Sequence, residues 1–369
     1  MSFPSLSPVL VIGGCGGLGH HLVQLLVEDS SSSDIAVLDI NTKNNRIDGV
    51  KYLEGSLSSR HEVLQAIQEV KPRVIFHTAS PKLMVQANTR QLYTEVNVNG
   101  TTLLLECIRA IGVTKALIYT SSSSVIHNNM TDLVNATEDV PLCFEPEQTE
   151  YYTHTKAVAE QIILSANKQN QLLTTIIRAA MLFGEGDATS TPQLVGNARA
   201  GRGKFQIGNG TNLFDFTYIG NTAYANVLAA KALLRESAAT EPVPEDSKVN
   251  GEAFVITNDD PWPFWDYTRA IGAAAGHPVK KEDIWVVSAT AYYYFVIILE
   301  WAAWVFSFGR KESVANRRMV KYLTMTRTFD ISKAKKRLGY RPQVSMQEGI
   351  QRTVDFYVAR HPEGRKATW

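Results

Sequence analysis

A tyrosine and a lysine in the stretch TEYYTHTKAVAEQII, residues 149–163, have the types and spacing of an acid–base pair. Tyr152 and Lys156 are four residues apart, so their side chains share one face if this stretch is a helix. Tyr151, at the same spacing, reaches only the uncharged Thr155. A free phenol has a pKa of about 10 and is a poor base at neutral pH, whereas a nearby lysine ammonium stabilises the phenolate and lowers that pKa. The pattern indicates Tyr152 as a general base held by Lys156; the alternative is an ordinary exposed helix pair.

A glycine-rich stretch near the N-terminus, GGCGGLG, places Gly13, Gly16 and Gly19 in a GxxGxxG spacing. Such a loop allows a tight turn, a close backbone approach to a pyrophosphate, and a helix N-terminus aimed at negative charge. Twenty residues after Gly19 comes Asp39, whose carboxylate would accept hydrogen bonds from a ribose 2′-OH and repel a 2′-phosphate. The pattern predicts a dinucleotide site for NAD rather than NADP; the alternative is a glycine turn that only packs a helix on a sheet.

Strand and helix patterns alternate around these motifs. Apolar runs predict strands at 8–14, 34–40, 49–56, 72–80, 115–124 and 172–184, and 3.6-residue periodicity predicts helices at 17–29, 58–70, 94–112 and 149–163. Strands that alternate with helices predict an α/β protein with a Rossmann-type, doubly wound parallel sheet. We place the NAD-binding core at 1–183 and a smaller substrate lobe, interleaved with closing core elements, at 184–369.

The order of these motifs resembles the extended short-chain dehydrogenase/reductase superfamily: GxxGxxG, Asp39, HTAS at 77–80, NVNGT at 97–101, a serine run and YxxxK. The resemblance implies that Ser122 is a catalytic serine beside Tyr152 and Lys156, and that Ser124 is a second candidate for a substrate contact. The cofactor-binding positions implied are Gly13, Gly16, Gly17, Leu18, Gly19, Asp39, Ser56, Leu57, Thr78, Ala79, Ser80, Lys82, Asn97, Ser122, Tyr152, Lys156 and Ala179.

Longer stretches are similar to a narrower family. YTSSSSVI, TEYYTHTKAVAE, NLFDFTYIGNTAYANVLAA (212–230) and GEAFVITNDDPWPFWDY (251–267) resemble the decarboxylating sterol-4α-carboxylate 3-dehydrogenases, a branch of the 3β-hydroxysteroid dehydrogenases. The resemblance covers roughly residues 9–355. It implies NAD-dependent oxidation of the 3β-hydroxyl of a 4α-carboxysterol, followed by loss of the C4 carboxylate as CO2.

The chain departs from that family in a few places. Ala179 and Met181 stand where proline and glycine are usual, and Ser56-Leu57 replaces an acid expected beside the adenine. These departures keep open a paralogous 3β-hydroxysteroid or triterpenoid dehydrogenase of secondary metabolism. A nucleotide-sugar epimerase and a non-catalytic NAD-binding sensor are the remaining alternatives.

The composition excludes some function classes. Lysine and arginine number 37 against 36 aspartate and glutamate, so no global charge favours nucleic acid. Three cysteines and eight histidines form no metal-like spacing, and the N-terminus has no signal-peptide pattern. We therefore expect a protein of a reducing compartment without a metal or a nucleic-acid partner. The resemblance to the superfamily implies a homodimer that pairs partly through the Tyr152 helix.

An apolar, aromatic segment at 286–308 has one charge, Glu300, and eight aromatic residues. It is long enough to span a bilayer, but the chain continues into what looks like the same fold, and aromatic richness suits an interface. We expect it to lie in the membrane surface, with a span or a buried helix as alternatives. Eleven basic residues between Arg310 and Arg341 favour the cytosolic face of the endoplasmic reticulum or lipid droplets. The family resemblance implies other sterol C4-demethylation enzymes as partners.

Overall fold

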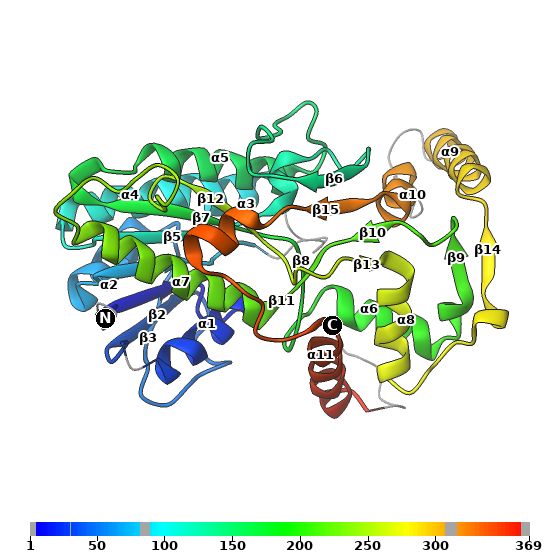
Figure 1. Cartoon of the computed structure of the whole chain (residues 1–369), viewed down its shortest axis with the longest axis horizontal. Helices are drawn as coiled ribbons and strands as arrows, with labels where there is room; N and C mark the ends of the chain where they lie inside the picture. The colour runs from blue at the N-terminus through cyan, green and yellow to red at the C-terminus, as the bar shows by residue number, and fades with distance from the viewer. Residues whose placement is uncertain (1–4, 30, 82–88, 307–315, 363–369) are drawn as a thin grey trace.

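The computed structural model describes residues 5–29, 31–81, 89–306 and 316–362. Its centre is a seven-stranded, all-parallel sheet in the order β12-β7-β5-β4-β1-β2-β3 (Figure 1). The strands are β1 (Val9–Ile12), β2 (Ile35–Asp39), β3 (Lys51–Glu54), β4 (Val74–His77), β5 (Ala116–Ser122), β7 (Leu173–Ala179) and β12 (Ala253–Ile256). The order reverses between β1 and β4, where ligands of such sheets bind at the carboxyl ends of the strands. The predicted doubly wound parallel sheet is confirmed.

Helices cover both faces of this sheet, because its central strands are apolar on both sides. On one face, α1 (Gly17–Glu28) packs on α7 (Ile219–Ser237). On the other lie α2 (Arg60–Val70), α4 (Gly100–Ile111) and α5 (Tyr151–Ser165). Packing in these two layers positions the N-termini of α1 and α5. The glycine loop precedes α1, and Tyr152 lies in the first turn of α5.

Three predicted elements are irregular or divided at the carboxyl edge of the sheet. The predicted helix at 94–112 consists of a π-helical turn, Thr94–Asn99, which follows α3 (Arg90–Tyr93) and precedes α4. The serine run leaves β5 at Ser122 and forms a 3-10 turn, Ser123–Ile126. The predicted strand at 172–184 divides into β7 and β8 (Met181–Phe183), which pairs with β11 (Phe216–Tyr218). All three irregularities lie where a ligand would bind.

A smaller lobe packs beside the carboxyl edge around an aromatic cluster that includes Phe183, Phe214, Phe216 and Tyr267. Its helices are α6 (Ser190–Arg199), α8 (Phe264–Ala274), α10 (Arg317–Thr324) and α11 (Met346–Arg360). Its small sheets join β13 (Trp262–Pro263), β10 (Leu213–Phe214), β15 (Arg327–Phe329) and β6 (Leu133–Ala136), and β9 (Phe205–Ile207) with β14 (Trp285–Val287). Strand β6 precedes residue 183 but belongs to the small lobe, whereas α7 and β12 follow it but belong to the core. The two lobes are therefore interleaved along the sequence.

Helix α9 (Ala289–Phe306) lies beside α10 at the end of the molecule away from the large sheet (Figure 1). Val296 is its one buried residue. Within the described ranges it is the helix long and apolar enough to cross a membrane, by length and composition. Its single charge, Glu300, accepts hydrogen bonds from the backbone N–H and the Nε of Arg317, each at 2.7 Å. The charge inside the apolar segment is therefore paired toward α10.

Candidate active site

The backbone of the glycine loop lies so close to neighbouring backbone atoms that two of its positions have no room for a side chain. Such a loop lets a dinucleotide approach the backbone closely. Gly13 has a φ of +81°, and a Cβ there would come within 2.7 Å of the Ala79 backbone. A Cβ on Gly19 would lie 2.1 Å from the carbonyl oxygen of Gly13. Helix α1 begins directly after this turn, and its N-cap Gly16 makes no side-chain cap. The free N–H groups of the first turn therefore remain available to a pyrophosphate.

Asp39 ends β2 beside this loop. Its carboxylate accepts hydrogen bonds from the backbone N–H of Cys15 at 3.0 Å and of Asn41 at 3.2 Å. Burial and the Asp39 charge together raise the pKa of the Cys15 thiol to about 11. Arg46 lies over the ring of Tyr52, 4.5 Å from its centroid. The Asp39 carboxylate, held in this way at the end of β2, can accept hydrogen bonds from a ribose diol and would repel a 2′-phosphate.

A chain of hydrogen bonds links the predicted cofactor segment after β4 to helix α5. The Ser80 hydroxyl donates to the Asn97 side chain (2.9 Å), and the Asn97 amide donates to Thr155 Oγ1 (2.9 Å). Thr155 in turn donates to the carbonyl of Tyr152 (2.8 Å). Asn97 lies on the π-helical turn and is buried. The structure therefore brings together Ser80, Asn97 and Tyr152, while Lys82 lies outside the described residues.

Tyr152 lies in the first turn of α5, with its ring edge-on to Tyr93 at 5.6 Å. Burial raises the pKa of Tyr152, and a hydrogen bond with Ser80 offsets part of that rise. The pKa lowering by Lys156 expected from the YxxxK spacing is thus not seen in the chain alone. The physical reason is that desolvation disfavours the phenolate, while the lysine ammonium is directed to another acceptor.

That acceptor is a backbone carbonyl. Lys156 Nζ donates to the carbonyl of Thr120 at 2.6 Å and lies 4.2 Å from the centroid of the Tyr119 ring. Burial lowers the pKa of Lys156 to about 7, against an opposing effect of Glu160. Burial, then Lys156, also lowers the pKa of His77 to about 3, so this neighbour of Tyr119 is neutral. Lys156 is thus a buried amine held at the base of the site.

This burial predicts a pH dependence of stability. The pKa of Lys156 is about 7 in the folded chain and about 10.5 when exposed. Between these values the unfolded chain binds more protons, so this residue makes the free energy of unfolding rise with pH, by up to about 1.4 kcal/mol per pH unit. In Lys156→Met that contribution is absent. Urea unfolding at pH 7, 8 and 9 should therefore show the variant's stability relative to the native chain falling as pH rises; parallel curves would contradict this.

Ser122, at the end of β5, is the register partner of Ala179 on β7, so these two predicted residues are neighbours in the sheet. The Ser122 hydroxyl oxygen accepts the backbone N–H of Ser124 at 3.2 Å, which leaves its own proton for another acceptor. The Ser124 oxygen accepts a hydrogen bond from Arg327 Nη2 at 2.8 Å. Both predicted serines thus lie on one turn at the carboxyl edge.

The predicted adenine-side residues lie after β3. The Ser56 backbone N–H donates to Glu62 Oε2 at 2.6 Å, so Glu62 brings an acid to this turn although Ser56-Leu57 does not. Leu57 is buried against Gly100, and Leu18 is half-buried against the apolar core. Side-chain packing thus occupies Leu57 and Leu18, and any cofactor contact they make would come from the backbone or the side-chain edge.

Several residues of this site were not predicted from the sequence. His77, Tyr119 and Thr120 surround Lys156, and Tyr93 packs on Tyr152. His77 ends β4, and its register partner Tyr119 lies within the neighbouring strand β5. Arg327 had appeared only as one charge of a basic stretch, and its place beside the serine turn had no local signal.

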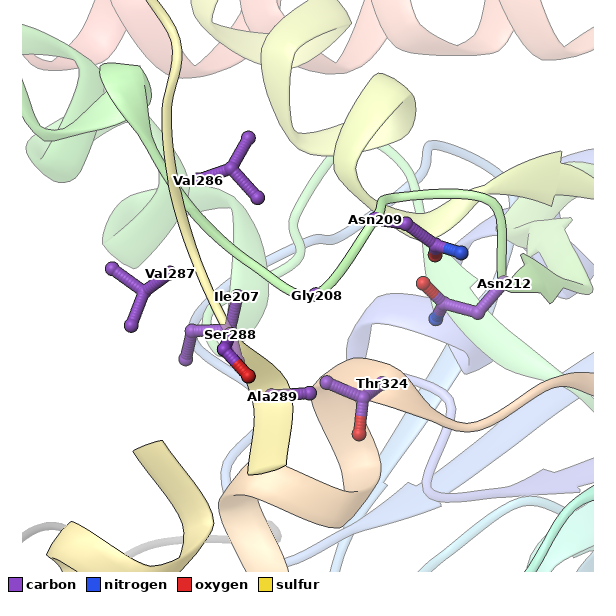
Figure 2. Close-up of a pocket in the computed structure, with 9 residues that line it drawn as sticks. All are labelled: Ile207, Gly208, Asn209, Asn212, Val286, Val287, Ser288, Ala289 and Thr324. Atoms are coloured by element: carbon purple, nitrogen blue, oxygen red, sulfur yellow. The ribbon is translucent and has the colours of Figure 1, made fainter. Parts of the chain in front are cut away.

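A separate cavity of about 390 Å³ lies at the base of α9 (Figure 2). Its polar lining residues are Asn209, Asn212, Ser288 and Thr324, and its apolar ones are Ile207, Val286, Val287 and Ala289. Asn212 is held by the carbonyls of Leu323 and Met325, at 3.3 and 3.0 Å. None of the predicted catalytic or cofactor residues lines this cavity, so it is distinct from the site described above.

Comparison with known proteins gives a family match and near full-length relatives. Residues 10–286 match the 3-beta hydroxysteroid dehydrogenase/isomerase family. Proteins named sterol-4-alpha-carboxylate 3-dehydrogenase, decarboxylating, are 36% identical in Candida albicans (95% of this chain, 98% of that protein) and 37% identical in Saccharomyces cerevisiae (95% and 97%). The protein of that name in Homo sapiens is 35% identical (94% and 87%).

Solved structures match in fold. The UDP-glucose 4-epimerase of Thermus thermophilus, in complex with NAD, has a TM-score of 0.68 at 22% identity, covering 96% of this chain and 99% of its own. The dTDP-glucose 4,6-dehydratase of Bacillus anthracis, in complex with NAD, has a TM-score of 0.68 at 20% identity (96% and 97%). At these identities the likeness establishes the fold alone.

Proposed function

We propose that this chain, which belongs to the 3-beta hydroxysteroid dehydrogenase/isomerase family, oxidises the 3β-hydroxyl of a 4α-carboxysterol with NAD and releases the C4 carboxylate as CO2. The observation that carries the proposal is the 35–37% identity, over about 95% of the chain, to proteins named for this reaction. The site supports it, because the glycine loop, Asp39, Ser122, Tyr152 and Lys156 meet at one edge of the sheet.

Tyr152 and Ser122 form hydrogen bonds with the substrate oxygen at C3. Tyr152 takes the hydroxyl proton as general base, and Ser122, whose oxygen already accepts the Ser124 N–H, donates its proton to the same substrate oxygen. When Lys156 is protonated, its positive charge stabilises the phenolate form of Tyr152. The glycine loop and Asp39 would hold NAD, which would supply the acceptor for the hydride from C3.

The decarboxylation follows from the ketone. Oxidation places a C3 carbonyl β to the C4 carboxylate, so the bond between C4 and the carboxyl carbon can break with its electron pair moving into the C3–C4 bond. CO2 leaves, the negative charge develops on the C3 oxygen, and the enolate is then protonated at C4. Ser122 and Tyr152 are the hydrogen-bond donors for the oxygen that gains charge, as required for stabilising this transition state.

The product identifies the reaction. Purified protein with NAD and a 4α-carboxy-3β-hydroxysterol should yield a 3-ketosterol that lacks the carboxyl group, detected by mass spectrometry. A panel containing triterpenoid acids tests the alternative substrate class. Met181, whose Sδ accepts a hydrogen bond from the Tyr322 hydroxyl at 3.6 Å, is one of the departures that keep this class open. A 3-keto product that retains the carboxyl group after prolonged incubation would contradict decarboxylation, and no product from any substrate would contradict the dehydrogenase.

We propose that α9 lies in a membrane surface, on the cytosolic face of the endoplasmic reticulum or on lipid droplets. Tyr294, Ile298 and Trp301, spaced along one side of the helix, are 63–64% exposed, and Trp285 on β14 is 74% exposed. Aromatic side chains suit the headgroup region, and Glu300 is paired with Arg317 away from this side.

Several basic residues of the stretch between Arg310 and Arg341 form ion pairs within the protein or are buried, so they do not face a membrane. Lys333, Lys335 and Lys336 form ion pairs with Glu252, Asp259 and Asp246, and Arg327 is buried. Arg318 and Lys321 on α10 are exposed beside α9 and remain candidates for anionic headgroups. The apolar patch therefore carries the membrane proposal more than the charge does.

A vesicle-binding measurement tests this placement. The double variant Ile298→Ser, Trp301→Ser should bind phosphatidylcholine vesicles at least about tenfold more weakly, because each buried apolar side chain contributes about 1.5–3 kcal/mol. Val134→Ser, at a comparably exposed apolar residue on β6, is the matched control and should bind as the native chain does. Equal binding by all three proteins would contradict an interfacial role for α9.

We also propose a homodimer through the outer faces of α4 and α5. Leu103 on α4 and Ile162 on α5 are half-buried apolar residues on this layer. Light scattering during size-exclusion chromatography distinguishes a dimer from a monomer of 40.9 kDa. Association with other sterol C4-demethylation enzymes remains a prediction from the family resemblance.

A further inference from the structure

Glu160 is a buried acid on the same helix as the tyrosine and lysine of the site. Helix α5 carries Tyr152, Lys156 and Glu160 at four-residue intervals, so their side chains follow one face of the helix. Lys156 is 2% exposed, and Glu160 is fully buried. The mechanism described above uses the first two residues and gives Glu160 no role.

The two carboxylate oxygens of Glu160 differ in their contacts. Its Oε1 accepts hydrogen bonds from the Nε of Arg178 at 2.9 Å and from the Nη2 of the same side chain at 2.5 Å. Its Oε2 has no hydrogen-bond partner within the described residues. A buried carboxylate oxygen without a partner is unfavourable, so its presence needs a physical explanation.

A purely structural role explains only part of this arrangement. Arg178 lies on β7, so its ion pair with Glu160 connects α5 to the central sheet. Buried ion pairs add little net stability, because the cost of taking both charges out of water offsets their attraction. The connection uses Oε1 alone, and it leaves the position of Oε2 unexplained.

The cation on the same helix face is Lys156, one turn before Glu160. Burial lowers the pKa of Lys156 to about 7, and the charge of Glu160 acts against burial by favouring the ammonium form. The other titratable groups around the pair are phenols, a neutral imidazole, the Arg178 guanidinium and one more acid: Tyr152 on α5, Tyr93 on α3, Tyr119 on β5, His77 on β4, Arg178 on β7, and Glu138 beyond Arg178. Glu160 is thus the carboxylate next to Lys156 among the described residues.

We propose that Glu160 is a positioning residue that sets the charge of Lys156, with Arg178 fixing the place of its carboxylate. The inference rests on the proposed function, in which a charged Lys156 stabilises the phenolate of Tyr152. Glu160 keeps the ammonium form of Lys156 populated while Tyr152 exchanges its proton with the substrate. It acts through its negative charge, and no proton is transferred to it.

The sign of the effect follows from electrostatics. A nearby negative charge favours the protonated forms of both Lys156 and Tyr152, so its removal lowers the pKa of each. The two groups titrate as a pair, and the pH–rate profile reports the pKa values of that pair. In Glu160→Gln both limbs of the profile should therefore move to lower pH, by about one pH unit for a charge one helical turn away.

The test is the pH dependence of kcat/KM for a 4α-carboxy-3β-hydroxysterol, measured by NADH formation on the full chain with saturating NAD. Glu160→Gln retains an oxygen that can accept the Arg178 hydrogen bonds, so it changes the charge more than the packing. The variant should lose about tenfold relative to the native chain on the alkaline limb, since a shift of one pH unit changes the charged fraction of Lys156 about tenfold.

Glu138→Gln is the matched control. The Glu138 carbonyl accepts a hydrogen bond from Arg178 Nη1 at 3.4 Å, and its side chain accepts the Val255 N–H at 2.7 Å. This variant removes the same charge from the other side of Arg178, away from Lys156. Its pH profile should match that of the native chain.

A second variant covers the case in which Glu160→Gln does not fold. Glu160→Met combined with Arg178→Met replaces the ion pair by apolar side chains, a change that buried pairs often tolerate. Its profile should also move to lower pH, but by less, because the negative charge that it removes is the one nearer to Lys156.

A measurement without substrate separates this inference from the proposed function. NMR of ¹³Cε-labelled lysines follows the charge of Lys156 directly, and its signal is assigned by its absence in Lys156→Met. Glu160→Gln should lower the midpoint of this titration by about one pH unit. An unchanged midpoint, with rates lowered equally at every pH, would mean that Glu160 only connects α5 to the sheet and would overturn the inference. A native chain that oxidises no sterol would contradict the proposed function, while the NMR midpoint would still decide whether Glu160 sets the charge of Lys156.

Discussion

Replacing Tyr152 with phenylalanine should lower kcat for sterol oxidation by about a thousandfold, because general base catalysis contributes about 10²- to 10⁴-fold. The variant retains the aromatic ring that packs on Tyr93 at 5.6 Å, so the fold of α5 should be preserved. NAD affinity should change little, since Lys156 and the glycine loop are unaltered. NADH formation under saturating NAD measures the first effect, and calorimetric titration with NAD measures the second.

Tyr151→Phe is the matched control on the same helix. The Tyr151 hydroxyl shares a hydrogen bond with Thr94 at 2.7 Å, and its ring lies under Arg90 at 3.7 Å, away from the proposed chemistry. This variant should retain activity within a few-fold. The assignment of the base would be wrong if Tyr152→Phe kept more than a tenth of the native rate, or if Tyr151→Phe lost as much.

Gly19→Val should abolish cofactor binding at micromolar protein. A Cβ at this position would lie 2.1 Å from the Gly13 carbonyl oxygen and 2.6 Å from the Gly14 Cα, and both are backbone atoms that cannot move alone. The loop and the start of α1 must therefore shift, at a cost of about 3 kcal/mol, which weakens NAD binding by about a hundredfold or more. Titration with NAD and thermal unfolding measure the two effects.

The control for this variant is Gly196→Val on α6, where a Cβ has open space within 4 Å and the backbone is helical. It should leave NAD affinity and stability close to native. Native-like NAD affinity in Gly19→Val would contradict the placement of the pyrophosphate on this loop.

Local pattern explains why much of the fold could be predicted from the sequence. The alternation of apolar strands with amphipathic helices determines a doubly wound sheet, and the glycine spacing with Asp39 places its cofactor edge. The i, i+4 spacing of Tyr152 and Lys156 is likewise a property of one helix. These features depend on residues close together in the chain, and the structure confirms the architecture they predict.

Contacts between distant segments could not be predicted in this way. Lys156 lies against the Thr120 carbonyl because β5 passes beneath α5, and Arg327 reaches the serine turn from about 200 residues away. The basic stretch looked like one surface, yet Lys333 pairs with Glu252 and Arg327 is buried. Charge and hydroxyl type are visible in a sequence, but which charge faces which hydroxyl depends on how the strands are ordered.

The central claim is that oxidation and decarboxylation are coupled on one site, and simultaneous measurement of NADH and CO2 tests it most directly. Purified protein with NAD and a 4α-carboxysterol should release both products in equal amounts, and Tyr152→Phe should silence both. NADH without CO2 would contradict the decarboxylating function and leave a plain 3β-hydroxysteroid dehydrogenase.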